Sequence, residues 1–245
     1  LNEKNIQVIF EHLIEKKKTT KLNQLIDKIF DNSNSKLLDY AILNLNENGL
    51  EKVFKKLKEN PDKISILDTK SITIFLELKH NKKEDLDFIY KELTNNADNV
   101  SKLIKAANGT KHKEKLTKSI YENIEDNPDI IAALDHKVIL ILFKNKKINF
   151  SDLFSKIKNN DVKFALYNSD LTTDKKEKIF NNLAENLGSL STSQTDSLIQ
   201  SNQGVLKNEK LITSQIANFN TEKLDKFLAE STKNIYTLST AKKLK

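Results

Sequence analysis

The stretch "ENPDKISILDTKSITIFL" at residues 59–76 decides the fold, because much of it returns as "DNPDIIAALDHKVILILF" at residues 126–143. When residues 60–78 are aligned with residues 127–145, nine of the nineteen positions are identical. Self-similarity at a fixed spacing is typical of an array built from one small supersecondary unit. The chain is therefore predicted to be a repeat protein.

Weaker copies of the same pattern lie between and beyond these two stretches. Each begins with two apolar residues, two polar residues and a third apolar residue, which is the spacing of one face of an amphipathic helix. Successive longer copies begin 31 to 36 residues apart. The longer copies are "VFKKLKENPDKISIL" (53–67), "IYKELTNNADNVSKL" (89–103), "IYENIEDNPDIIAAL" (120–134) and "LFSKIKNNDVKFAL" (153–166), with shorter echoes at 9–16, 25–32 and 179–186.

Polar residues at the start of the repeated stretch are predicted to begin helices. Asn60 is expected to be an N-cap with Pro61 at the first helical position, where proline is well tolerated. Asp68 and Asp135 each precede an apolar helical stretch, and we expect each to cap it. Their alternative interpretation is a pair of catalytic carboxylates one repeat apart, which no neighbouring catalytic residue supports.

Other helix boundaries follow from short polar patterns. Asn48-x-x-Glu51, Asn81-x-x-Glu84 and Asp174-x-x-Glu177 resemble capping boxes in front of amphipathic helices. Gly49 and Gly109 each follow an asparagine and are predicted to close helices in the left-handed conformation. Strand signals are scarce, because apolar alternation is rare and the chain has only four glycines.

These patterns predict an all-α protein, a curved α-solenoid of stacked helix-turn-helix repeats. No single amphipathic helix pair buries its apolar face alone, so neighbouring units must stack. The helical-repeat array is predicted over residues 1–188, with "KSITIFLEL" (70–78) and "KVILILF" (137–143) as inner helices. Residues 189–245 are richer in Ser, Thr, Gln and Asn and are predicted to form a helical C-terminal cap or the start of a further unit.

The period and helix pairing of residues 9–190 resemble HEAT and armadillo repeats, without their consensus positions. In style the chain is also similar to the helical-repeat surface antigens and effectors of obligate intracellular bacteria. All 41 basic residues are lysines, and this bias with abundant asparagine is typical of an AT-rich genome. The chain also begins at Leu1 and contains no Met, so we interpret it as a fragment. The resemblance implies a secreted or surface-exposed part of a larger bacterial protein.

The net charge of +7 predicts an anionic partner surface. The absence of arginine argues against specific base and phosphate recognition, which favours guanidinium groups. Three lysine clusters are the candidate partner-binding sites, although solvated turns of a lysine-biased protein are the simpler interpretation. The candidates are Lys16, Lys17, Lys18, Lys21, Lys111, Lys113, Lys115, Lys144, Lys146 and Lys147.

Motifs for catalysis or cofactor binding are missing from the sequence. Cysteine is absent, and the four histidines form neither HxxxH nor HExxH, so no metal site is predicted. His136 beside Asp135 is tempting as a site, but Thr69 takes its place in the other copy, which favours a surface role. Phosphate-binding and nucleophile motifs are also absent, so we expect no cofactor and no enzymatic activity.

The sequence therefore predicts a non-catalytic protein–protein interaction scaffold, in its sharpest form a pathogen or symbiont factor that binds a host protein. Two alternatives stay open: a basic helical-repeat module that binds nucleic acid, and a structural spacer of a large surface protein. No membrane span is expected, because the longest apolar run, residues 138–143, is far shorter than the roughly 20 residues that a bilayer requires.

Overall fold

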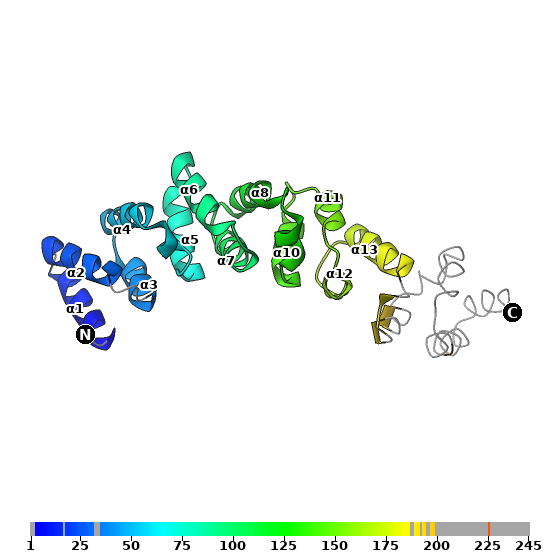
Figure 1. Ribbon diagram of the computed structural model, residues 1–245, viewed down its shortest axis with the longest axis horizontal. Helices are drawn as coiled ribbons and strands as arrows, with labels where there is room; N and C mark the ends of the chain where they lie inside the picture. Colours follow the sequence, from blue (N-terminus) through cyan, green and yellow to red (C-terminus); the bar gives the residue numbers. More distant parts are fainter. Residues whose placement is uncertain are drawn as a thin grey trace. The chain divides into compact units, whose positions relative to one another are not determined.

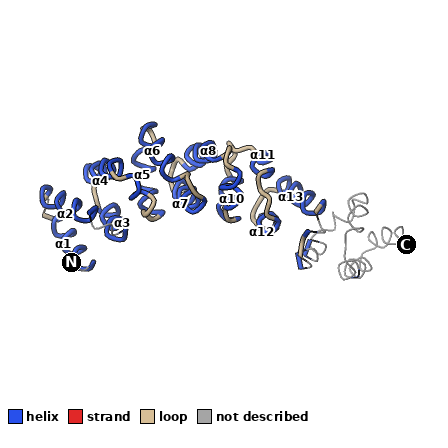
Figure 2. The backbone as a smooth tube through the Cα atoms, in the orientation of Figure 1, coloured by secondary structure: helices blue, strands red, loops and turns tan. Residues whose placement is uncertain are grey.

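The computed structural model describes residues 3–16, 18–31, 35–186, 189–191, 193–194, 197–198 and 225. Within these residues the chain forms thirteen α-helices, one 3-10 helix and no strand, so the all-α prediction is confirmed (Figure 2). The elements are α1 Glu3–Glu15, α2 Thr19–Asp31, α3 Ser35–Asn44, α4 Glu47–Glu59, η1 Pro61–Ile64, α5 Thr69–Lys79, α6 Lys83–Leu93, α7 Ala97–Asn108, α8 Lys113–Ile124, α9 Pro128–Ala133, α10 His136–Lys144, α11 Phe150–Ser155, α12 Asn160–Tyr167 and α13 Thr173–Glu185.

The chain divides into two compact units, the first ending at Lys156 and the second beginning at Ile157. In the second unit α12 packs against α13. The predicted boundary between residues 188 and 189 stays a prediction, because most of residues 189–245 lies outside the part that the structure describes.

Helices of the first unit alternate between two rows (Figure 1). The first row contains α2, α4, α6, α8 and α11, and the second row contains α1, α3, α5, α7 and α10. Helices of the second row pack directly on one another in succession, α1 on α3, α3 on α5, α5 on α7 and α7 on α10. In the first row, α4 and α6 are joined through η1, which contacts both. The two predicted inner helices are α5 and α10, and both belong to the second row.

Burial of the predicted apolar face holds the first-row helices in place. In α4, Val53, Phe54 and Leu57 are at most 2% exposed, as the i, i+1, i+4 spacing predicts. The equivalent faces of α6 and α8 are also buried, so the predicted register is confirmed in three helices. Those faces are formed by Ile89, Tyr90 and Leu93 and by Ile120, Tyr121 and Ile124.

The second-row helices α5, α7 and α10 share one N-terminal design. Asp68, Asn96 and Asp135 are their N-caps, and each side chain accepts the backbone N–H of the residue three positions later, at 2.7, 2.9 and 2.9 Å. This bond satisfies an amide that the helix itself leaves free. The predicted capping roles of Asp68 and Asp135 are therefore confirmed.

The cap predicted at Asn60 is wrong in its side-chain role. The Asn60 amide donates back to the Lys56 carbonyl at 3.0 Å, and Pro61 begins a short 3-10 helix. The equivalent Asn127 does cap α9, accepting the Ile130 N–H at 3.3 Å. The two copies differ because Asn60 is followed by a 3-10 helix, whereas Asn127 is followed by an α-helix. The Asn60 side chain bonds back to α4, the helix before it.

The three predicted capping boxes are also wrong, because their helices begin one or two residues away from the predicted caps. The N-cap of α4 is Asn46, whereas α6 and α13 begin after Lys82 and Thr172, neither of which makes a side-chain capping bond. Gly49 lies in the first turn of α4, not at a helix end. Gly109 does follow the last turn of α7, but its φ of −77° is right-handed, so its predicted left-handed conformation is wrong.

Several side-chain hydrogen bonds join residues that lie about one repeat apart in the sequence. Lys52 bonds Asn23, 29 residues earlier, and Lys102 bonds the Ser65 carbonyl, 37 residues earlier. These separations are close to the 31 to 36 residues between copies of the sequence pattern, so the bonds join neighbouring copies. Further examples are Tyr40 with Glu11, Thr73 with the Ala106 carbonyl, Asn145 with Thr117 and Lys156 with Tyr121.

Candidate functional site: a basic edge and a groove in the first row

The predicted lysine clusters all lie in, or in the helix ends directly beside, turns that lead from the second row to the first row. Residues 16–21 span the α1–α2 turn, 111–115 the α7–α8 turn and 144–147 the α10–α11 turn, while the α5–α6 turn adds Lys82 and Lys83. We call these four turns the basic edge. Lys17 lies outside the described residues, and the other nine predicted lysines are exposed: Lys16, Lys18, Lys21, Lys111, Lys113, Lys115, Lys144, Lys146 and Lys147.

Contacts between consecutive turns show that three of the four turns lie next to each other. Lys115 Nζ donates to the His80 carbonyl at 3.4 Å, which joins the α7–α8 and α5–α6 turns. Asn145 Nδ2 donates to the Glu114 carbonyl at 2.8 Å, which joins the α10–α11 turn to the start of α8. The topology therefore gathers lysines from separate parts of the sequence, and their partner-binding role stays a prediction.

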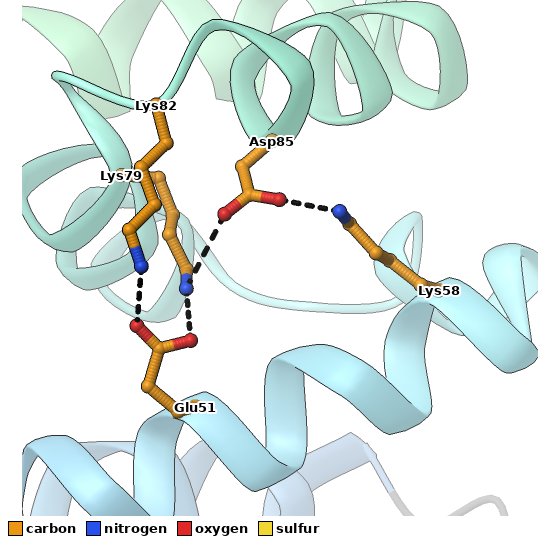
Figure 3. Close-up of polar contacts among 5 residues, drawn as sticks. All are labelled: Glu51, Lys58, Lys79, Lys82 and Asp85. Carbon is orange, nitrogen blue, oxygen red and sulfur yellow. Dashed lines mark hydrogen bonds and ion pairs between the residues drawn. The ribbon is translucent and has the colours of Figure 1, made fainter.

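One lysine near this edge is buried instead of exposed. Lys79, at the end of α5, is only 1% exposed and lies between α4 and α6 (Figure 3). Its ammonium group pairs with Glu51 and, at 3.4 Å, with Asp85, and it lies 4.6 Å from the centre of the Phe54 ring. A buried ammonium requires such partners, because its desolvation is costly.

The charges around Lys79 form a structural network. Lys82 also pairs with Glu51, at 3.1 Å, and Lys58 pairs with Asp85 (Figure 3). The hydrogen bond from Lys79 is the main cause of the lowered pKa of Glu51. For Asp85, burial acts to raise the pKa, but the bond and charge of Lys58, with the charge of Lys79, outweigh it and lower the pKa. Every one of these charges has an opposite partner, so the network joins three helices and offers no free reactive group.

An aromatic residue recurs at one position of the first-row helices. Phe54, Tyr90 and Tyr121 follow the first apolar residue of the repeated pattern in α4, α6 and α8, whereas in α2 Ile26 takes that position and Phe30 lies one turn later. All four rings are between 2% and 4% exposed. We call this the aromatic position, and each ring points toward the next helix of the first row.

Each of these rings is contacted by a side chain of the following first-row helix. That side chain lies two residues before or two residues after the aromatic position of the helix that carries it. Lys56 Nζ, from α4, lies 5.8 Å from the centre of the Phe30 ring. Phe88, from α6, packs edge-on against Phe54 with 5.8 Å between ring centres. A cation–π pair therefore joins α2 to α4, and an aromatic pair joins α4 to α6.

At Tyr121 the cover is an ion pair. The Tyr121 hydroxyl donates to Asp152, and Lys156 donates to the same hydroxyl at 3.1 Å and to Asp152 at 3.0 Å. Burial, followed by the bond to Asp152, raises the pKa of Tyr121 to about 12. The phenol is thus held in its protonated, hydrogen-bond-donating form.

At Tyr90 the equivalent cover is missing. The residues of α8 that align with Asp152 and Lys156 are Ser119 and Asn123. The Tyr90 hydroxyl is enclosed, and Ser119 acts on it as a hydrogen-bonding neighbour, although the contact falls outside normal hydrogen-bond geometry. Burial, followed by the charge of Asp87, raises the pKa of Tyr90 to about 12.

A groove of about 390 Å³ opens between α6 and α8 at this place. It is lined by residues of α6 and α8 and by three residues of the basic edge, while the Tyr90 hydroxyl itself is enclosed. We call it the Tyr90 groove. The residues that matter for its chemistry are His80, Lys83, Tyr90, Lys115, Ser119 and Asn123.

Two histidines beside the groove stack on each other, which the sequence did not indicate. The rings of His80 and His112 lie 3.8 Å apart between centres and only 11° from parallel. His80 Nδ1 lies 2.7 Å from the Glu77 carbonyl and therefore donates its proton there. The pair joins the α5–α6 turn to the α7–α8 turn.

No three His, Asp or Glu side chains in the described part of the chain lie close enough together to hold a metal ion. Asp135 is committed to capping α10 and also pairs with Lys105 at 3.5 Å, while His136 is the first residue of that helix. No described helix combines the length and apolar content that crossing a bilayer requires.

Comparison of the chain with protein-family models, with curated proteins and with solved structures found no match. The resemblance to HEAT and armadillo repeats thus rests on period and helix pairing alone.

Proposed function

We propose that this chain is a non-catalytic interaction scaffold, a curved α-solenoid of stacked helical hairpins whose basic edge binds an acidic protein partner. The two alternating rows support this proposal, as do the side-chain bonds that join residues one copy apart. An array in which each hairpin contacts its neighbours presents an extended surface, and such surfaces bind extended partners.

The difference in packing between the two rows is the observation that supports curvature. Helices of the second row contact one another in succession, whereas grooves open at two places in the first row. One such groove, of about 280 Å³, lies between α2 and α4 and is lined by Asn23, Asp27 and Lys56, and the Tyr90 groove lies between α6 and α8. Helices on the inner side of a bend pack more closely, so the second row would form the concave side.

The charge of the basic edge supports an acidic partner. Its exposed lysines come from four turns, and few carboxylates lie among them. Exposed charges of this kind steer association and fix specificity more than they add affinity, and salt screens them. The lysine-biased composition further supports the narrower proposal, a pathogen or symbiont factor that binds a host protein.

Affinity capture from host-cell lysate tests the proposal, with the bound proteins identified by mass spectrometry. The informative variant carries Lys113→Glu, Lys146→Glu and Lys147→Glu on the basic edge. Its matched control carries Lys55→Glu, Lys70→Glu and Lys137→Glu, which change the net charge equally but lie away from that edge. We expect the wild type and the control to capture the same one or two proteins and the edge variant to lose them.

Nucleic-acid binding is the second candidate, because the same lysines could neutralise phosphates. Nuclease treatment of the lysate distinguishes the two functions. Recovery that collapses with nuclease, together with a steep salt dependence, would favour nucleic acid. An empty eluate with wild-type protein would contradict both functions and leave the structural spacer.

A further inference from the structure

We propose that the α7–α8 and α10–α11 turns form a single binding site for a run of carboxylates in an acidic protein segment, with Asn145 as the residue that positions its lysines. This inference rests on the proposed function and names the part of the basic edge that the acidic partner would contact. It comes from a buried polar side chain that the repeat pattern does not require.

Asn145 is a buried amide at a position where the other copy has an apolar residue. It directly follows α10 and is only 5% exposed. The repeat alignment places the half-buried Leu78 of α5 at the equivalent position. Burying an unpaired amide costs free energy, so an asparagine here must form hydrogen bonds that a leucine does not need.

The Asn145 side chain bonds to both turns. Its Nδ2 donates to the Glu114 carbonyl at 2.8 Å and to Thr117 Oγ1 at 2.6 Å, and both acceptors belong to α8. Thr117 in turn donates to the Lys113 carbonyl at 2.6 Å. Asn145 Oδ1 accepts the Lys147 backbone N–H at 2.9 Å. One side chain therefore holds the backbone of Lys147 next to the start of α8, where Lys113 lies.

The result is a cluster of ammonium groups that come from two separate parts of the sequence. Lys113 and Lys115 lie in the first turn of α8, and Lys146 and Lys147 directly follow Asn145. All four lysines are exposed. Charges held close together bind a run of opposite charges more tightly than the same charges apart, because several contacts form in one binding event.

The surrounding groups favour carboxylates of a protein over nucleic acid. Two carboxylates lie nearby: Glu114 is exposed, and Glu77 accepts the Lys111 backbone N–H at 2.6 Å. The lysines outnumber them, so the cluster is basic. It contains no guanidinium group for bidentate phosphate contacts. The tyrosines of the adjacent first-row helices, Tyr90 and Tyr121, are buried, so they offer bases no exposed ring for stacking.

The test uses a fluorescein-labelled, end-capped octaglutamate peptide, with binding followed by anisotropy at low salt. Asn145→Leu introduces the residue of the equivalent position 78 and keeps the net charge. We expect it to bind the peptide about 5- to 10-fold more weakly than the wild type, with a shallower salt dependence, because fewer lysines engage together. Asn99→Leu is the matched control. Asn99 is 8% exposed and bonds Asn95 at the start of α7, away from the basic edge, so its loss should change the affinity by less than about two-fold.

A double-mutant cycle separates positioning from a purely structural role. Replacing Lys146 and Lys147 by alanine should weaken binding, and Asn145→Leu should then have almost no further effect, because it acts through those lysines. An equal loss from Asn145→Leu in both backgrounds would overturn the inference, as would wild-type affinity in a folded Asn145→Leu. Circular dichroism and thermal unfolding establish that each variant is folded. Thr117→Val, which removes one acceptor of the Asn145 amide, should give a smaller loss and provides the test if Asn145→Leu does not fold.

The outcome is separable from that of the proposed function. Lysate capture that depends on Lys113, Lys146 and Lys147 but persists in Asn145→Leu would overturn the inference and leave the scaffold. Loss of capture in Asn145→Leu but not in Asn99→Leu would support both. Tighter binding of an oligothymidylate of equal charge than of octaglutamate would overturn the inference in favour of nucleic acid. No octaglutamate binding by a wild type that still captures its partner would overturn the inference alone.

Discussion

Lys79 is a charged residue in the core, and its replacement measures what the network contributes. Lys79→Met keeps an aliphatic side chain over Phe54 but removes the ammonium group from Glu51 and Asp85. We expect the free energy of unfolding to fall by about 2 kcal/mol, less than the roughly 3–5 kcal/mol of a fully buried pair, because Glu51 is 39% exposed. Urea unfolding measures the change, and Lys55→Met on the exposed face of α4 should have little effect.

Acid should remove the same contribution. The pKa of Glu51 is lowered mainly by its bond from Lys79, and the pKa of Asp85 is also lowered. Groups with a lowered pKa in the folded state stabilise the protein above their unfolded pKa, and this stability disappears as the pH falls through the folded pKa. Wild-type stability should therefore decline below about pH 4.5. An equally steep decline in Lys79→Met would contradict this role.

Two tyrosines should ionise late in an alkaline titration. Burial is the first cause at both Tyr90 and Tyr121, and each pKa is raised to about 12. Because the unfolded chain loses these protons near pH 10, the stability that they provide is lost between about pH 10 and 12. Tyr90→Phe should remove part of the ultraviolet absorbance change near pH 12. Loss of absorbance change near pH 10 instead of near pH 12 would show that Tyr90 is exposed in solution.

For single residues, the repeat alignment predicted which side chains occupy equivalent places but not which groups they bind. Tyr90 and Tyr121 align in the sequence, and both are buried. Their hydroxyls differ because of Ser119 and Asp152, which come from the next helix of the first row. Extending the alignment by two residues on each side of the aromatic position shows this difference. Its meaning requires knowing that those residues face the tyrosines.

Capping is the clearest test at the scale of a single helix. Asp135→Ala removes the acceptor for the Val138 N–H at the start of α10 and should destabilise the protein by about 1 kcal/mol. The exposed Asp129, in the first turn of the short helix α9, provides the control. Thermal unfolding of Asp135→Ala and Asp129→Ala compares them. An equal loss in both would mean that the aspartates act through charge alone.

The sequence located some helix starts and missed others for a physical reason. Asp68 and Asp135 occupy the same position of the repeat, shortly before an apolar run, so the two copies indicate the same cap. Before α4 the chain reads Asn-Glu-Asn, and the backbone selects Asn46 instead of the predicted Asn48. In an asparagine-rich chain several candidate caps lie within two residues, and the packing of the helix decides among them.

At the scale of the molecule, the first unit is predicted to fold without the second. Each helix of residues 3–156 contacts neighbouring helices within that unit, and arrays held by nearest-neighbour contacts tolerate truncation between units. A fragment that ends at Lys156 should keep its helical circular dichroism and unfold cooperatively in urea. A disordered fragment would contradict this expectation.

The sequence predicted helix pairs and their period, because apolar spacing is local. It did not indicate that the lysine clusters at 111–115 and 144–147 lie next to each other, although the alternation of rows implies that turns of one kind lie on the same side. The Tyr90 groove could not be found from composition. It is the space that remains because Ser119 and Asn123 are shorter than Asp152 and Lys156. Such a groove becomes visible only when neighbouring copies are compared in three dimensions.

The short sequence separation between hydrogen-bonded residues also has a consequence for biosynthesis. A residue such as Lys102 meets its partner Ser65 only 37 positions behind it, as Lys52 meets Asn23 at 29. At a translation rate of about 5–20 residues per second, each new hairpin completes these bonds roughly 2–7 s after its partner has been synthesised. Each hairpin can therefore pack against a folded neighbour as it leaves the ribosome. Little apolar surface is then exposed to solvent during synthesis.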